Sequence, residues 1–127
     1  MRDLMASMQI LASNGLLIVE DADTAFEGML DVGEAPVTAT GDVLLVKVQS
    51  DADGLVAASV IGSDGETTLP VTVFEGEINL SYGRLRVRDV GAENAIVVGL
   101  DDGPCHVRVV VDDAAYPKTV EILVPPL

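Results

Sequence analysis

The chain has 127 residues, the usual size of one domain, and 49% of them are hydrophobic. Its 21 acidic residues outnumber 7 Lys and Arg, giving a formal net charge of −14 at pH 7. Such a field repels nucleic-acid phosphates and anionic membrane surfaces, so we expect neither as a partner. A basic protein or a cation fits the charge better. The alternative is that the acidity only keeps a chain with a mean hydropathy of +0.41 in solution.

The composition favours strands over helices. Valine occupies 20 positions, and its branched Cβ suits a pleated sheet. There are two Phe, two Tyr and no Trp, so the core must be aliphatic. The same scarcity of aromatic residues disfavours sugar-binding and single-strand nucleic-acid modules, which stack their ligands on exposed rings.

Two apolar runs, 9–12 and 16–20, are joined through Asn14-Gly15. Both of these residues tolerate positive φ, so the segment predicts a β-hairpin with a type I′ turn. Residues 21–42 then contain six acids, three glycines and Pro36 without a sustained period. We expect a long acidic connection there, with one helical turn around 25–30.

From residue 43 the chain consists of short Val-rich runs separated by Gly, Asp, Asn and Pro. We expect strands at Val43–Gln49, Leu55–Ile61, Thr67–Phe74, Glu77–Ser81, Arg84–Val90, Ala95–Leu100, Cys105–Asp112 and Thr119–Val124. With the two runs of the hairpin this makes about ten strands. The rhythm predicts a single all-β domain over 1–127, either an antiparallel β-sandwich of jelly-roll type or a flattened barrel.

Alternation assigns the faces of two strands. In 84–88, Leu85 and Val87 should face the core and the arginines should face outward. In 106–112 the valines at 107, 109 and 111 should face inward. Runs 43–46 and 95–98 are apolar on both faces, so each is either a covered central strand or part of a contact between copies.

The outward arginines are the candidate binding residues of this sequence. They are Arg84, Arg86, Arg88 and Arg108. Their planar guanidinium groups could bind a carboxylate, a phosphate or the acidic patch of a partner. The alternative is that they form ion pairs with acids on neighbouring segments, such as Glu75, Glu77 and Glu93.

Catalytic and metal-binding patterns are missing from the sequence. The turn at Asp51-Ala52-Asp53-Gly54 has acids two residues apart but lacks the remaining ligands of a calcium loop. Cys105 is the single cysteine, and on a strand it would leave the opposite face from the sole histidine, His106, so the two cannot form a catalytic dyad. We expect no enzyme, no cofactor and no metal. Because we see no signal-peptide pattern and no membrane-length apolar run, we expect a cytoplasmic protein.

Two segments carry a resemblance to a known family. INLSYGRLRVRD at 78–89 and DGPCHVRV at 102–109, with the Val-rich run at 95 between them, are similar to the competence J family of small bacterial proteins. The resemblance extends over about residues 78–110. It implies a β-sandwich that inhibits a nuclease, hence an inhibitor or immunity-type function. The chain departs from that family in its lack of aromatic residues and in residues 21–42.

These observations support a ranked set of functions. The leading hypothesis is a non-enzymatic protein-interaction module, an acidic inhibitor or immunity-type protein with a basic partner. The first alternative is a structural or assembly subunit that forms a homo-oligomer through its doubly apolar strands. The second is a small anion-binding module at an arginine-lined face.

Overall fold

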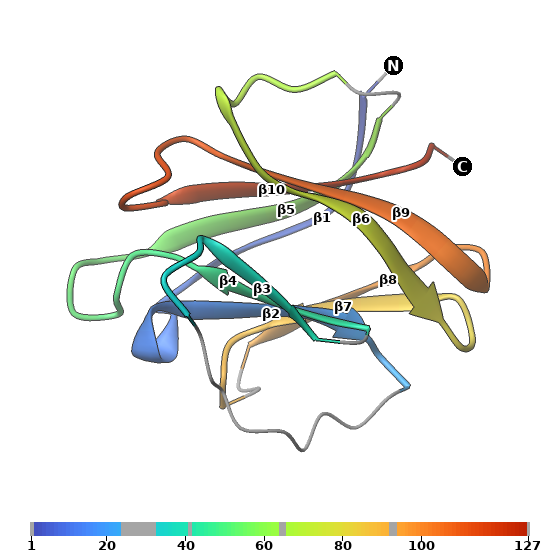
Figure 1. Cartoon of the computed structure of the whole chain (residues 1–127), viewed down its shortest axis with the longest axis horizontal. Coiled ribbons are helices and arrows are strands. Elements are labelled where there is room, and N and C mark those ends of the chain that lie inside the picture. Colours follow the sequence, from blue (N-terminus) through green and yellow to red (C-terminus); the bar gives the residue numbers. More distant parts are fainter. Residues whose placement is uncertain (1, 24–32, 41, 64–65, 92–93, 127) are drawn as a thin grey trace.

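Two five-stranded β-sheets pack face to face in the computed structural model, which describes residues 2–23, 33–40, 42–63, 66–91 and 94–126 (Figure 1). The strand order is β1-β5-β10-β9-β6 in the first sheet and β3-β4-β2-β7-β8 in the second. Within this described part of the chain the sheets do not close into a barrel. The expected all-β sandwich is therefore confirmed, and the flattened barrel is not found.

The strands of the two sheets interleave along the chain. The first sheet holds β1 (Arg2–Ile10), β5 (Val56–Ser63), β6 (Val71–Leu80), β9 (Gly103–Val111) and β10 (Thr119–Val124). The second sheet holds β2 (Leu16–Asp21), β3 (Val37–Thr40), β4 (Val43–Lys47), β7 (Arg84–Arg88) and β8 (Ala95–Gly99). A 3-10 turn, η1 (Ser13–Gly15), joins β1 to β2. The strand pairs are antiparallel except β5 with β10, which is parallel.

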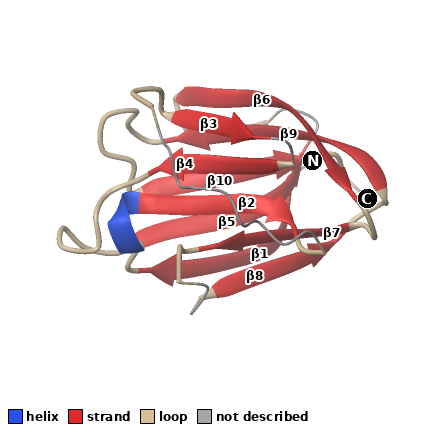
Figure 2. Ribbon diagram, turned by 60° about the horizontal axis from the view of Figure 1, so that its bottom comes forward, coloured by secondary structure: helices blue, strands red, loops and turns tan. Residues whose placement is uncertain are grey.

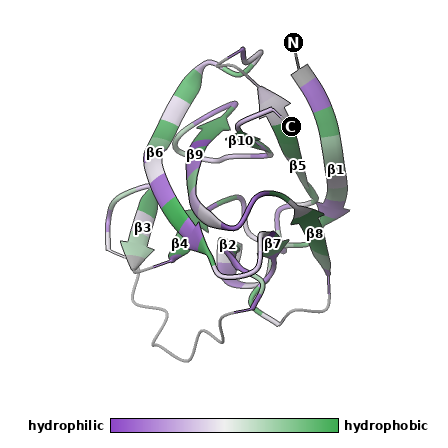
Figure 3. Ribbon diagram, turned by 90° about the vertical axis from the view of Figure 1, so that its right-hand side faces the viewer, coloured by the Kyte–Doolittle hydropathy of each residue, from purple (hydrophilic) through white to green (hydrophobic). Residues whose placement is uncertain are grey.

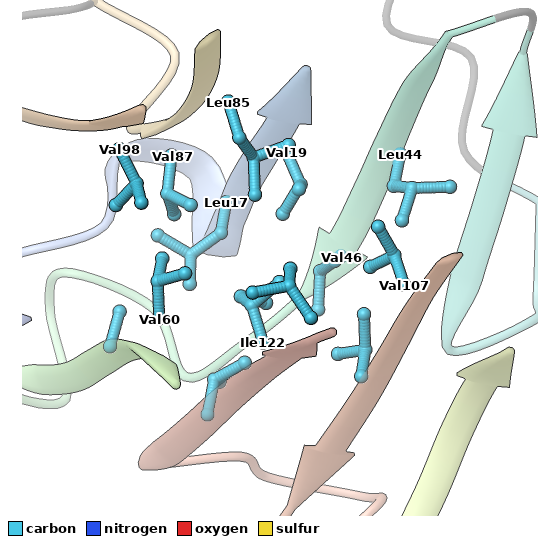
Figure 4. Close-up of a cluster of buried hydrophobic side chains, with 14 of the residues drawn as sticks. Leu17, Val19, Leu44, Val46, Val60, Leu85, Val87, Val98, Val107 and Ile122 are labelled. Atoms are coloured by element: carbon cyan, nitrogen blue, oxygen red, sulfur yellow. The ribbon is translucent and has the colours of Figure 1, made fainter. Parts of the chain in front are cut away.

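Alternate side chains of both sheets fill one aliphatic core (Figure 4). In it Leu17 and Leu44 from the second sheet meet Val60, Val107 and Ile122 from the first. Each such buried side chain contributes about 1.5–3 kcal/mol to folding. Figure 3 shows apolar and polar bands along β6, whose Ile78 and Leu80 also belong to this core. The predicted orientation of β7 and β9 is confirmed, since Leu85, Val87 and the odd-numbered valines of β9 lie in the core.

The runs 43–46 and 95–98, which are apolar on both faces, occupy different positions in the second sheet. Strand β4 is internal to its sheet, and its outward Val43 and Leu45 form a second buried cluster with Ile18 of β2, against which Val90 packs. It is thus a covered central strand. Strand β8 lies at the edge of the same sheet, and its outward Val97 is half exposed.

The hairpin predicted at Asn14-Gly15 is wrong. Both residues do adopt positive φ, 59° and 64°, as the turn chemistry requires. The chain nevertheless crosses from one sheet to the other there, because β1 pairs with β5 while β2 pairs with β4 and β7. A Cβ on Gly15 would lie 2.9 Å from the carbonyl oxygen of Val48, so the crossing also needs glycine for close approach.

Three strands differ from expectation by more than a few residues at their ends. Strand β1 begins at Arg2, well before the apolar run at 9–12. Its start was not predicted because a register shift between Leu4 and Ala6 interrupts the alternation of its side chains. The connection 21–42 contains β3, a short strand that pairs with β4. The two strands expected around Glu75-Gly76 form one strand, β6, whose irregularity is a shift between Thr72 and Phe74 rather than a turn.

The helical turn expected at 25–30 lies outside the described residues. In the part of the chain that is described, no helix has the length and apolar character needed to cross a membrane.

Candidate functional site

The four predicted arginines do not share one face. Arg84, Arg86 and Arg88 project from β7 onto the outer face of the second sheet. Arg108 projects from β9 onto the outer face of the first sheet, so the whole sandwich lies between it and the others. The single arginine-lined face is therefore wrong, because strand order, which the sequence pattern does not encode, places β7 and β9 in different sheets.

Two of these arginines enclose a buried carboxylate. Glu20 lies opposite Arg86 on the neighbouring strand β2 and has no exposed surface. Its Oε2 accepts hydrogen bonds from Nε of Arg86 at 2.7 Å and from Nε of Arg88 at 2.6 Å. Nη1 of Arg88 also donates to the carbonyl oxygens of Asp89 and Val90, at 3.0 and 3.1 Å. The guanidinium of Arg88 is thus occupied by this chain's own acceptors.

The third arginine of β7 forms a surface pair. Arg84 donates from Nε to Oδ2 of Asp23 at 3.1 Å and forms an ion pair with the same carboxylate. This hydrogen bond, followed by the charge of Asp23, raises the pKa of Arg84. The prediction of ion pairing is confirmed for the arginines of β7, but their partners are Glu20 and Asp23 rather than Glu75 or Glu77. Glu93 lies outside the described residues.

A second buried carboxylate, which sequence reasoning missed, ties β2 to the turn between β6 and β7. Oδ2 of Asp21 accepts hydrogen bonds from the backbone N–H of Ser81 at 3.1 Å and from its hydroxyl at 2.7 Å. In the same turn Gly83 has φ 69°, and its carbonyl accepts the N–H of Leu100 at 2.6 Å. The buried Asp21 therefore holds the start of the arginine-bearing strand in place.

The outer face of the first sheet has a hollow of about 300 Å³ whose lining includes Ser63, Glu75, His106 and Arg108. Nε2 of His106 lies 2.9 Å from Oε2 of Glu75, and Arg108 donates to the hydroxyl of Thr72 at 2.8 Å. Ser63 is no nucleophile for His106, because β10 separates their strands by about 10 Å.

Cys105 faces the other way, into the core, where burial raises the pKa of its thiol. It therefore leaves the opposite face of β9 from His106, as alternation predicts.

A different surface forms at one end of the sandwich, where η1 and the loops 48–55 and 112–118 meet (Figure 1, left). We call it the loop end. Two hollows of about 400 and 340 Å³ share Gln49, Asp53 and Tyr116 in their lining. Tyr116 is 69% exposed, and Leu11 and Leu55 are also exposed nearby in the fold.

The acidic residues of the loop end shape its backbone. Oδ1 of Asp112 accepts the backbone N–H groups of Lys118 and Thr119, and Oδ1 of Asp113 accepts that of Ala115 at 2.8 Å. Asp51 and Asp53 are exposed on the facing loop. Exposed aromatic and aliphatic side chains ringed by charge are typical of protein interfaces. Among the described residues, no group of three or more His, Cys, Asp or Glu side chains could hold a metal ion.

The described residues define a class of protein: a sandwich of two five-stranded sheets in which arginines of one strand form ion pairs with carboxylates of the preceding part of the chain. Two solved structures have a similar fold over nearly the whole length of this chain. ComJ from Bacillus subtilis, inhibitor of the DNA-degrading activity of NucA, matches with a TM-score of 0.77 and 12% identity over 100% of this chain and 99% of its own. The product of crocagin biosynthetic gene J matches with a TM-score of 0.65 and 17% identity over 99% and 98%.

The sequence comparisons add no further likeness, since no family model and no curated protein matches the chain. The resemblance to the competence J family noted from residues 78–110 is confirmed at the level of the fold, and it extends over the whole chain.

Proposed function

We propose that the chain is a non-enzymatic, acidic protein-binding module of the inhibitor or immunity type, acting in the cytoplasm on a basic protein partner. The observation that carries the proposal is the fold shared over the full chain with ComJ, an inhibitor of a nuclease. The net charge of −14 supports the same partner chemistry, because an acidic protein can occupy a basic cleft that normally receives nucleic acid.

The partner is proposed to bind at the loop end. Tyr116, Leu55 and Leu11 supply exposed apolar surface there, and Tyr is enriched among the residues that dominate binding energy. Asp51 and Asp53 stand beside this surface and complement Lys and Arg side chains. The outer face of the second sheet is a poorer site for a basic partner, because Glu20 is fully buried and already pairs with Arg86 and Arg88 of β7.

The test is capture of partners from an extract of the native host on the immobilised chain, with salt steps. We expect a basic protein that elutes as salt rises, because screening weakens contacts between exposed charges. The captured protein is then purified, and its enzymatic activity is measured with and without the chain. A set of captured proteins that contains no basic protein and is unchanged by salt contradicts the proposal.

A matched pair of variants tests the place of binding. Asp51→Asn/Asp53→Asn removes two exposed acids at the loop end, and Asp101→Asn/Asp102→Asn removes two exposed acids at the opposite end. Both variants change the net charge by the same amount. The first should weaken the complex by about tenfold or more, and the second should change it far less.

Anion binding at Arg108 is a second candidate function, favoured by the hollow that Arg108 and His106 line. Thermal-shift measurements with phosphate and small carboxylates test it. Stabilisation that is lost in Arg108→Gln supports the candidate, and no stabilisation by any of these anions removes it.

A further inference from the structure

The four sheet edges of the sandwich are protected to different degrees. An exposed edge strand offers unpaired backbone N–H and C=O groups to another chain, and proteins usually block it with bulges, charges or short strands. Strand β1 has a register shift at Leu4–Ala6 and carries the exposed Asp3. Strand β6 has a shift at Thr72–Phe74 and carries Glu75 and Glu77. Strand β3 has four residues and directly follows Pro36.

Strand β8 is short, like β3, and lies close to β1 of the other sheet, but it has no bulge and no charged residue. Its five residues, AIVVG at 95–99, include no charge and no proline. Its pairing with β7 runs without a register shift, so the strand keeps a regular edge. It forms the margin of the second sheet in Figure 2, and the outward Val97 is 50% exposed.

We propose that β8 is a self-association edge, at which a second copy of this chain adds its own β8 antiparallel across a two-fold axis. The full overlap of five residues centres the axis on Val97. It pairs Ala95 with Gly99, Ile96 with Val98 and Val97 with its counterpart. Small residues then meet at both ends and β-branched residues meet in the middle, so the strand is complementary to itself. The second sheets of the two copies become one sheet.

A second copy fits this edge better than the basic partner of the proposed function. A basic protein gains from acidic groups, and β8 itself has none. Two copies, each with a net charge of −14, repel one another, and an uncharged strand is where their contact costs least. The apolar side chains of the neighbouring edge strand β1, Met5 and Met8, are only partly buried and lie on the same side of the sandwich as β8.

Charge and contact size together predict a weak dimer whose stability rises with salt. Pairing through one short strand falls in the class of small interfaces, below about 1,200 Å², which are transient. Salt screens the repulsion between the two acidic copies, because the Debye length falls from about 10 Å at 0.1 M to about 3 Å at 1 M. Binding of a basic partner has the opposite salt dependence, so failure of this inference and failure of the proposed function are distinguishable.

The first experiment is sedimentation of the purified full chain across concentrations from about 1 to 500 µM, at low and high NaCl. We expect a monomer–dimer equilibrium that shifts towards dimer at high salt. Val97→Lys should weaken dimerisation by about tenfold or more, because it sets two like charges opposite each other. Leu55→Lys is the matched control: it places the same charge at a side chain of similar exposure, 53%, and should dimerise like the parent chain.

A second experiment does not depend on a bulky substitution at the edge. Val97→Cys places two cysteines directly opposite each other across the two-fold axis, and mild oxidation should link the copies within the native fold. Leu55→Cys should not form this dimer, and Cys105 is buried in both variants. A strictly monomeric chain at every salt and concentration overturns the proposal. So does a Val97→Lys chain that dimerises as well as its control, or equal cross-linking of the two cysteine variants.

Discussion

Substituting Glu20 by Gln tests the buried ion triad on the outer face of the second sheet. Gln keeps the size of the side chain and removes its charge, so Arg86 and Arg88 lose the carboxylate that pairs with both of them among the described residues. The side chains of Arg86 and Arg88 are 29% and 11% exposed, so water reaches the first only in part and the second hardly at all. Removing one partner of a buried ion pair costs about 3–5 kcal/mol.

We expect Glu20→Gln to lower the free energy of unfolding by about 3 kcal/mol, the lower end of that range, because Arg86 can recover some hydration. For a chain of this length the melting temperature should fall by about 10 °C. Urea and thermal unfolding followed by circular dichroism measure both quantities. Asp23→Asn is the control: its partner Arg84 is solvent-exposed, so little change is expected.

A further variant separates the charge from the packing. Replacing all three groups at once, as Glu20→Leu/Arg86→Met/Arg88→Met, removes the charges together and should recover most of the stability lost in Glu20→Gln. A loss below about 1 kcal/mol in Glu20→Gln would refute the reasoning, since a carboxylate with these contacts cannot be removed so cheaply if it is buried between two arginines.

Two further predictions concern the turn between β6 and β7 and the core. Gly83→Ala should destabilise the fold by about 1–3 kcal/mol in urea unfolding, because the residue has φ 69° and a Cβ would collide with the carbonyl oxygen of Leu100. Gly99→Ala is the control, since the space around its Cβ position is open. Burial raises the pKa of the Cys105 thiol, so at pH 8 a thiolate-specific reagent should label the native protein more than about tenfold slower than the urea-unfolded chain. Because the unfolded chain ionises first, the same shift lowers stability as pH rises through the thiol's range; equal labelling rates of native and unfolded protein would show that Cys105 is accessible.

Local pattern was enough to predict the class of fold and the faces of the late strands. Strict alternation at 84–88 puts Leu85 and Val87 in the core and the arginines outside, as the structure has them. It could not give strand order, which depends on contacts between distant residues. Two consequences follow: Glu20 was not recognised as the partner of residues 66 and 68 positions away, and Arg108 was grouped with arginines of the other sheet.

The turn at Asn14 and Gly15 was predicted correctly, but the hairpin expected from it was wrong. Asn14 and Gly15 adopt the backbone conformation of a type I′ turn, yet the strands on either side continue into different sheets. Dihedral preference fixes the local bend, whereas pairing with strands distant in the sequence, β5 for β1 and β4 and β7 for β2, decides which sheet each strand joins. Irregular strands were the hardest to predict, because the register shifts in β1 and β6 interrupt the period on which such a prediction depends.

We propose above that this acidic sandwich binds a basic protein at its loop end. The most direct test of this proposal is the affinity of the purified complex with the captured partner, measured by titration calorimetry across salt concentrations for the parent chain and the two Asp→Asn pairs. Affinity should fall as salt rises, and Asp51→Asn/Asp53→Asn should weaken the complex far more than Asp101→Asn/Asp102→Asn does. An affinity that is unchanged by salt and equal in the two variants would contradict the proposal.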